Sequence, residues 1–401
     1  MTRHDTTPLR NIRVLDCASF MAAPMAAMWL GDFGADVIKV EHPSGDRMRD
    51  WGTAKDGVPL LWKVVGRNKR SIGIDFHQSD GQALLRQLVV QADVLVENFR
   101  PGTMARWGLD YPRLSEVNSR LVMLSISAFG QTGPYSERAG FGTLAEAMSG
   151  YAYATGQPGG PPTLPSFALA DAISGLCGAF AVMVALHERD RLSGRGQHID
   201  LGIYEPMLTM LGHQFIEYDQ LGIVAERLGS RVPFAAPRNV FLTADGAWVA
   251  ISSSAQSVFE RSCRAMGLDE LVTDPRFADN RCRIAHADEI DEIFAFWIRG
   301  HDAATVLERF NAAGAAAFRV YNVADVFSDA HVVARGNLTT VDDVDLGPIR
   351  MQNVVPKLER TPGEIRHPGP RVGEHTDEIL REWLDLDSGE IDELRQSGAV
   401  R

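Results

Sequence analysis

Asp171 is the first candidate for chemistry because it stands alone as a charged residue in a long apolar stretch. It lies in SFALADAISGLCGAFAVMVALHE, and no other Asp, Glu, Lys or Arg occurs between Glu146 and Glu188. A carboxylate at the start of a helix can be an N-cap, because its oxygens accept hydrogen bonds from the first-turn N–H groups. In a poorly hydrated pocket, the same carboxylate can stay ionised and attack an acyl carbon. This segment alone leaves both interpretations open.

A second group of polar residues, in VENFRPGTMARWG, suits a phosphate ligand. A predicted strand ends at Glu97, and Asn98 follows it directly. Arg100 then precedes a predicted helix whose first turns carry Arg106. Ligands of open α/β sheets gather at the carboxyl ends of strands, and a helix N-terminus with a neighbouring arginine favours an anion. The alternative is a surface loop with solvated arginines.

Two further segments are weaker signals. Lys69 and Arg70 precede a predicted strand in GRNKRSIGID, although such basic pairs are usually solvated. The segment SISAFGQTGPYSERAGFGTLAEAMSG contains closely spaced glycines, which allow a ligand to approach the backbone or simply permit unusual loop dihedrals.

The signatures of several enzyme classes are missing. The sequence has no GxGxxG after its first strand, no GxxxxGK[ST], no GxSxG and no HExxH, which argues against dehydrogenases, P-loop enzymes, α/β-hydrolases and zincins. Its four cysteines are far apart, without metal-ligand spacing, so we expect no metal site and a reducing cytoplasm. They are Cys17, Cys177, Cys263 and Cys282.

Composition narrows the choice of partners. The 401 residues are 45% hydrophobic and 23% charged, as in globular proteins, and the net charge is -12. This charge argues against a general binder of nucleic acid or anionic membranes, so an anionic ligand needs a local basic cluster. The N-terminus has no apolar signal-like run, and we interpret the apolar stretch from Ala172 to Leu186 as a buried helix.

The elements that must position these residues form an α/β pattern. Short β-rich runs alternate with helical ones over the first 130 residues, which predicts a parallel Rossmann-like sheet. Strands are expected from Arg13 and at 36–41, 71–74, 93–97 and 122–127, and helices at 21–33, 81–91 and 103–107.

The domain organisation follows from where this pattern changes. We predict a large α/β domain over residues 1–200, which binds the ligand and carries the chemistry, and a linker over 201–238 with a helix at 203–221. A small α+β domain over 239–329 begins with NVFLTADGAWVAIS, two strands around an Asp-Gly turn. Residues 330–401 return to the large domain and dock a C-terminal helix, with Thr376 expected as its N-cap.

The order of these motifs resembles the class III coenzyme A transferases, the family that includes formyl-CoA and carnitine-CoA transferases. The resemblance runs from about residue 10 to about residue 381, and α-methylacyl-CoA racemases share several of the motifs. It rests on GADVIKVE, NKRSIGID, VENFRPGTMARWG, SISAFGQTGPY, GFGTLAEAMSG, LADAISG, GRGQHIDLGIYE, DPRFADN and GEHTDEIL.

The resemblance implies specific roles and an assembly. Asp171 is similar to the family nucleophile, which forms an aspartyl-CoA thioester, so acyl-CoA and a small carboxylic acid would be substrates and no permanent cofactor is needed. Arg100 and Arg106 match positions that face the CoA phosphates. Asn98, Lys69 and Arg70 match further CoA contacts, and family members form interlocked homodimers.

Three departures from the family pattern bear on specificity. Phe141 occupies the place of the proton-transferring histidine of the racemases, and Met21 replaces a family glutamine. The glycine run of formyl-CoA transferases is also missing around 228–231. An acyl-CoA racemase and a non-catalytic acyl-CoA-binding protein remain alternatives to the transferase.

Arginines lie where that glycine run is missing. Arg231 or Arg238 could pair with the distal carboxylate of a dicarboxylic acid, since a guanidinium binds carboxylates bidentately. The alternative is that they only brace the stretch between the domains.

Overall fold

The protein, described here by a computed structural model over residues 7–401, divides into two compact units. The first unit comprises the described residues up to 151, residues 164–222 and residues 334–401. The second comprises residues 152–163 and 223–333, and it contains the predicted small domain of 239–329. Residues 1–6 of the predicted large domain lie outside the described residues.

The first unit is built on a six-stranded sheet of order β5-β2-β1-β6-β7-β8, in which every pairing is parallel. This confirms the predicted parallel α/β class. The chain runs outward from β1 to β5, then returns to β6 beside β1, so the strand order reverses between β1 and β6. The strands are β1 (Arg13–Asp16), β2 (Asp36–Glu41), β5 (Lys69–Gly73), β6 (Val94–Glu97), β7 (Val122–Ser127) and β8 (His198–Gly202).

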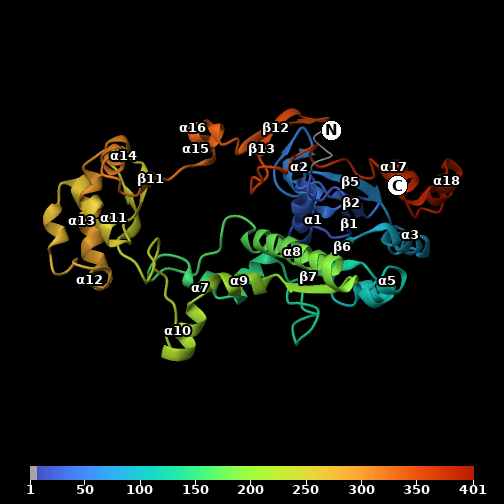
Figure 1. Ribbon diagram of the computed structural model, residues 1–401, viewed down its shortest axis with the longest axis horizontal. Helices are drawn as coiled ribbons and strands as arrows, with labels where there is room; N and C mark the ends of the chain where they lie inside the picture. The colour runs from blue at the N-terminus through green and yellow to red at the C-terminus, as the bar shows by residue number, and fades with distance from the viewer. Residues whose placement is uncertain (1–6) are drawn as a thin grey trace. The chain divides into compact units, whose positions relative to one another are not determined.

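Helices cover both faces of this sheet (Figure 1). On one face α1 packs against α8, which is possible because small residues meet there: a Cβ atom at Gly175 would lie 2.7 Å from Met25 Cβ. The other face is covered by α3, α5 and α17, and α17 brings Ile379, Leu380 and Trp383 into the core.

The helices of the first unit have between 4 and 20 residues. Its helices are α1 (Ala22–Asp32), α2 (Leu60–Val65), α3 (Ser79–Gln91), α4 (Thr103–Arg106), α5 (Tyr111–Val117), α6 (Gly142–Met148), α8 (Leu169–Glu188), α9 (Tyr204–Leu211), α10 (Gln214–Leu221), α17 (Thr376–Leu384) and α18 (Ser388–Gln396), with helical turns η2 (Arg47–Asp50) and η3 (Arg189–Ser193). Two hairpins join β3 (Ala54–Lys55) to β4 (Val58–Pro59) and β12 (Leu338–Asp343) to β13 (Gly347–Gln352). Helix α7 (Tyr151–Ala154) crosses into the second unit.

The second unit packs helices on a three-stranded antiparallel sheet of order β11-β10-β9. The predicted hairpin is confirmed: β9 and β10 pair around Asp245 and Gly246, and Gly246 adopts a φ of 80°. The strands are β9 (Arg238–Leu242), β10 (Trp248–Ser252) and β11 (Ala317–Arg319). The helices are α11 (Gln256–Met266), η4 (Asp269–Val272), α12 (Asn280–Ala285), α13 (Ala287–Arg299), α14 (Ala303–Ala312), α15 (Val323–Ser328) and α16 (Ala330–Ala334), the last ending at the unit boundary.

Three local predictions were wrong. The helix expected over 203–221 is two helices, because Gly212 adopts a φ of 57° between α9 and α10. Thr376 is the first residue of α17 and not its N-cap, since its hydroxyl donates to the carbonyl of Gly373. Helix α8 is longer than the predicted 172–186 and is not fully buried: one of its faces is exposed.

A cluster of buried ion pairs lies beneath the strand order reversal. Lys69 Nζ lies 2.8 Å from Asp16 Oδ2 and donates to the carbonyl of Pro24 in α1 at 2.7 Å. Lys39 Nζ lies 3.0 Å from Asp46 Oδ2 and donates to the carbonyl of Ala18. Burial lowers the pKa of the Lys69 ammonium, and Asp16 offsets part of that effect. The four charged side chains of this ionic cluster, Asp16, Lys39, Asp46 and Lys69, tie the loops after β1 and β2 to the sheet.

We predict that Lys69→Met lowers the free energy of unfolding by about 3–5 kcal/mol, because the buried Asp16 loses its nearer cation at 2.8 Å and keeps only Lys39 at 4.0 Å. The neighbouring Arg70→Met is the matched control. Arg70 pairs with the partly exposed Asp36, Glu378 and Glu382, so its loss should cost about 1 kcal/mol or less. Urea unfolding followed by circular dichroism measures both. Equal effects of the two substitutions would contradict the structural role of Lys69.

Candidate active site

A cavity of about 580 Å³ opens at the carboxyl ends of the parallel strands. Its wall is formed by the loops after β1, β2, β5, β6 and β7 together with the start of α8, all within the first unit. This edge of a doubly wound sheet is where such folds bind ligands. Its lining includes the predicted residues Asn98, Arg100 and Asp171, so the fold brings these three together.

Asn98 joins the two loops at the strand order reversal. Its Oδ1 accepts a hydrogen bond from the Ser19 N–H at 2.8 Å, and its Nδ2 donates to the Ser19 carbonyl at 2.6 Å. These two bonds use the amide to hold the loop after β1 against the loop after β6. The geometry therefore supports a positioning role for Asn98 on the cavity wall.

Phe20 is held in an unusual backbone conformation at the cavity. Its φ is 63°, which is uncommon for a bulky residue, and its N–H donates to Asp46 Oδ1 of the ionic cluster at 3.2 Å. The ring packs edge-on against Phe141 and also contacts Trp51, with centroids 5.7 and 5.0 Å apart. By holding the backbone of Phe20, the ionic cluster helps to place the rings of Phe20 and Phe141 on the cavity wall.

Asp171 is the third residue of α8 and not its N-cap. Ala168 occupies the cap position and provides no side-chain hydrogen bond, while Glu146 Oε1 accepts from the Ala170 N–H at 3.2 Å. Burial and the charge of Glu146 together raise the pKa of Asp171 to about 6, although a backbone hydrogen bond opposes the shift. Among residues 7–401, no Lys, Arg or His forms an ion pair with Asp171. The result is a partly desolvated carboxylate without a counter-ion.

Gly142 lets the carboxylate of Asp171 lie close to the backbone of α6. A Cβ atom at position 142 would collide with Asp171 Oδ2, so any side chain there would push the carboxylate away. The adjacent Phe141 lines the same cavity. Glycine at 142 therefore has a steric role at this site, which explains one of the five glycines in the segment SISAFGQTGPYSERAGFGTLAEAMSG.

The predicted basic residues separate into two groups. Arg100 lines the cavity with Arg47 and Arg138, two arginines that our sequence analysis did not select. Arg106 donates to Thr103 Oγ1 at 2.8 Å and does not line the cavity. The side chain of Lys69 is fully buried, and Arg70 is paired with acidic residues of β2 and α17. Both residues thus make contacts within the chain, and their contacts with CoA stay a prediction.

The position of Arg47 at the cavity was predictable from the loop that carries it. Arg47 lies in EHPSGDRMRD, directly after β2, and β2 pairs with β1. Any residue after this strand is at the same edge as Asn98, so strand adjacency is the signal that could have found it. Glu146 had no such signal, since its contact with α8 depends on tertiary packing.

The arginines of the second unit are engaged there. Arg231 pairs with Asp288 at 2.5 Å and with Asp291 at 2.6 Å, and Arg238 Nη1 donates to the Ser230 carbonyl at 2.6 Å. The bracing interpretation accounts for these contacts, and the carboxylate-binding role that we considered for Arg231 competes with two aspartates.

Comparisons with known proteins give a consistent result. A family model described as CoA-transferase family III matches residues 9–376. Two Chloroflexus aurantiacus proteins are similar over 98% of this chain and 98% of their own: a succinyl-CoA:D-citramalate CoA-transferase at 43% identity and the beta subunit of a succinyl-CoA:L-malate CoA-transferase at 44%. A crystal structure of a CAIB/BAIF family protein from Brucella suis has a TM-score of 0.83 and 33% identity, covering 94% of this chain and 100% of that chain.

We predict that Asp171→Asn raises stability at neutral pH. A carboxyl whose pKa is about 6 in the fold, above the ordinary 3.8, makes the folded state less stable as pH rises from about 4 to about 6. The variant should melt at a higher temperature than the wild type at pH 7.5, and the difference should shrink towards pH 4.

Asp190→Asn is the control of opposite sign. Hydrogen bonds from Arg189 lower the pKa of Asp190, so this substitution should destabilise at pH 7.5 and lose its effect on acidification. If Asp171→Asn instead lowers the melting temperature at pH 7.5, the desolvated state of Asp171 is contradicted.

Proposed function

The chain belongs to CoA-transferase family III and is an enzyme of that type, and from this premise we propose that it moves coenzyme A between dicarboxylic acids through a covalent thioester on Asp171. The observation that carries the proposal is the Asp171 carboxylate, which lines the cavity, is partly desolvated and has no cationic partner among residues 7–401. A nucleophile with these properties keeps its electron pair available for an acyl carbon.

The proposed reaction balances without an external acid, base or redox partner. The ionised carboxylate of Asp171 attacks the thioester carbon, the C–S bond breaks, and a mixed anhydride and CoA thiolate form. The thiolate then attacks the carbonyl carbon of Asp171, which releases the donor carboxylate and leaves aspartyl-CoA. The acceptor carboxylate repeats the two steps in reverse order and leaves with CoA. Because Asp171 must be ionised to begin, transfer should slow as pH falls through about 6.

The cavity lining includes cations of the kind that a CoA ligand requires. The diphosphate and 3′-phosphate of CoA need cations, which a chain of net charge -12 must supply locally. Arg47 and Arg100 line the cavity, and no residue within 7–401 accepts a hydrogen bond from either guanidinium. We assign phosphate contacts to these two arginines, and we keep Arg106, at the end of α4, as a further candidate.

Substrate class is proposed from the relatives. The two Chloroflexus proteins are named for succinyl-CoA as donor and for citramalate or malate as acceptor. Succinyl-CoA is the thioester of a dicarboxylic acid, and citramalate and malate are dicarboxylates. We propose a dicarboxylyl-CoA donor and a dicarboxylic acceptor for this chain.

Racemisation is a weaker candidate. Exchange at the α-carbon needs two titratable groups on opposite faces of the thioester, and Phe141, which lines the cavity next to Gly142, is apolar. His42 and His77 also line the cavity, but they follow β2 and β5, whereas Asp171 belongs to the helix packed on β7 and β8. The titratable neighbour of Asp171 is Glu146, whose Oε1 already accepts from the Ala170 N–H of the same helix.

We also propose that a second copy of the chain covers the exposed face of α8. Together with η3, this helix spans Leu169–Ser193 and is long and apolar enough to cross a bilayer, yet it packs against α1 and the sheet, and 44% of its most apolar window is buried. The open face carries Leu176, Phe180, Met183 and Val184, and α9 and α10 expose Met210, Phe215, Ile216, Tyr218 and Leu221. An apolar surface of this kind in a soluble enzyme marks an interface. The interlocked homodimer of the family accounts for it.

The compartment is proposed on chemistry alone. All four cysteines are free thiols, and Cys17 and Cys263 are buried. Free thiols suit the reducing cytoplasm, where CoA esters of dicarboxylic acids can be both made and used.

We predict that Asp171→Ala lowers the rate of CoA transfer from succinyl-CoA to malate by more than about a thousandfold, because the covalent route is lost. In wild-type enzyme treated with succinyl-CoA and then borohydride, the thioester on Asp171 should be reduced to an alcohol with release of CoA, and mass spectrometry should detect this change in the peptide containing Asp171. Hydroxylamine should inactivate only the wild type, and only with acyl-CoA present. Substantial transfer by a folded Asp171→Ala variant would refute the covalent mechanism.

For assembly, we expect sedimentation to give a dimer at micromolar concentration and Phe180→Asp to disrupt it. The side chain of Phe180 is 71% exposed in a single chain, so the substitution does not disturb the core of the first unit. Phe296→Asp is the matched control, because Phe296 is 85% exposed on α13 and belongs to no such patch. A folded wild-type monomer, or equal effects of the two substitutions, would contradict the interface.

A further inference from the structure

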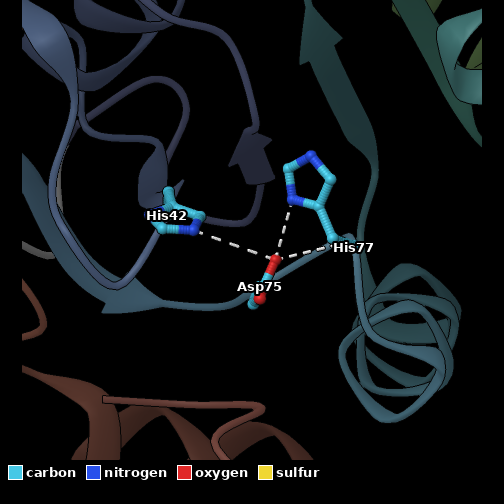
Figure 2. Close-up of side chains that lie close together, drawn as sticks. All are labelled: His42, Asp75 and His77. Atoms are coloured by element: carbon cyan, nitrogen blue, oxygen red, sulfur yellow. Dashed lines mark hydrogen bonds and ion pairs between the residues drawn. The ribbon is translucent and has the colours of Figure 1, made fainter.

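Three side chains that could ligate a metal converge where β2 and β5 end. His42 directly follows β2, while Asp75 and His77 follow β5. The two strands are parallel neighbours, with Glu41 opposite Gly73, so their carboxyl ends meet at one edge of the sheet. Figure 2 shows the two imidazoles turned towards the Asp75 carboxylate from different loops. Our sequence analysis expected no metal site from the spacing of the cysteines, and it did not consider His42 and Asp75, which lie 33 positions apart in the chain.

The distances are close to those of a coordination sphere. His77 Nδ1 lies 2.9 Å from Asp75 Oδ1, His42 Nε2 lies 3.9 Å from the same oxygen, and the candidate ligand atoms all lie within 4.8 Å of one another. Ligand bonds of about 2.0–2.2 Å in a tetrahedral zinc site place donor atoms about 3.4 Å apart. Small rotations of the two imidazoles, which are 51% and 72% exposed, satisfy this spacing.

The carboxylate and one imidazole are already oriented by neighbours. Asp75 Oδ1 accepts from the His77 backbone N–H at 2.9 Å, and Oδ2 accepts from Gln78 Nε2 at 3.1 Å. His42 Nδ1 lies 2.7 Å from Ser44 Oγ. The Ser44 backbone N–H also donates to His42 Nδ1 at 3.1 Å. Ligation through Nε2 therefore moves the ring proton to Nδ1, where Ser44 Oγ can accept it. Such outer contacts fix the tautomer and ring orientation of histidine ligands in metal sites.

We propose that His42, Asp75 and His77 bind one divalent transition-metal ion of the zinc class at the rim of the cavity. Imidazole nitrogen and carboxylate oxygen form a donor set that suits Zn²⁺, Co²⁺ and Ni²⁺ over Mg²⁺ or Ca²⁺. With neutral imidazoles the cluster carries the single negative charge of Asp75, which attracts a cation and repels a phosphate. The remaining coordination positions face solvent, so the ion can enter without opening the fold.

Metal binding by the whole protein without acyl-CoA tests the proposal independently of CoA transfer. Co²⁺ is added to the wild type and followed by its visible absorption, and Zn²⁺ affinity is measured by competition with a chromogenic indicator. We expect saturation at one ion per chain. His42→Gln, His77→Gln and Asp75→Asn should each weaken Zn²⁺ binding by at least about tenfold.

The matched control is His213→Gln. His213 Nε2 lies 3.8 Å from Glu217 Oε2 of α10. This is a histidine–carboxylate pair outside the proposed cluster of His42, Asp75 and His77. This variant should bind like the wild type, and far-ultraviolet circular dichroism checks that all variants are folded. Absence of saturable binding overturns the proposal. Zn²⁺ binding that the three cluster substitutions leave unchanged also overturns it. So does binding of inorganic phosphate, in place of Zn²⁺, at His42 and His77.

Discussion

The buried ionic cluster of Asp16, Lys39, Asp46 and Lys69 is the constraint on which the cavity depends. Taking four charges out of water is costly, and the cost is recovered only when each ammonium finds both a carboxylate and a backbone carbonyl. Those carbonyls belong to Ala18 and Pro24, and Asp46 also accepts from the Phe20 N–H. Satisfying the cluster therefore fixes the backbone between β1 and α1, which is one wall of the cavity.

Asp171 is the counterpart of that cluster, a carboxylate that the fold leaves unpaired. Asp16 and Asp46 each lie against a lysine, whereas Asp171 is desolvated next to another acid, Glu146. A paired carboxylate is stabilised and a poor nucleophile, while a desolvated one gains by sharing its charge with an acyl carbon. Exchange between thioester and anhydride involves bonds of similar energy. The modest destabilisation of the ionised Asp171 carboxylate by burial and by Glu146 therefore suits the proposed CoA transfer.

The elements of the sheet could be predicted from sequence, but the partners of its polar residues could not. Val122–Ser127 is an apolar run that a buried strand explains fully, and it was found with correct bounds. Lys69 begins an equally recognisable strand, yet nothing in a basic residue type indicates that its side chain points inward to Asp16. The strand β8 was missed because its alternating exposure at the sheet edge gives it no continuous apolar run.

The same limit explains why the sequence drew attention to Asp171 but not to the cluster of His42, Asp75 and His77. An isolated charge in an apolar stretch is visible along the chain, whereas the pairing of β2 with β5 is a property of the sheet. Strand order converts distant positions into neighbours, and it is not written in local periodicity.

Helix α8 connects the chemistry to the proposed assembly. Asp171 lies near its N-terminus and Phe180 lies nine residues further along, about 14 Å away at a rise of 1.5 Å per residue. The glycines and alanines of one face hold α8 against α1, while Leu176, Phe180, Met183 and Val184 are exposed. In a single chain, α8 is thus held from one side. In the proposed homodimer, a partner on the other side would clamp the helix that carries the proposed nucleophile, and the position of Asp171 beside Gly142 would then depend on both contacts. This dependence would give such an enzyme a reason to be an obligate dimer, because the proposed interface over α8 would complete the geometry of the Asp171 carboxylate.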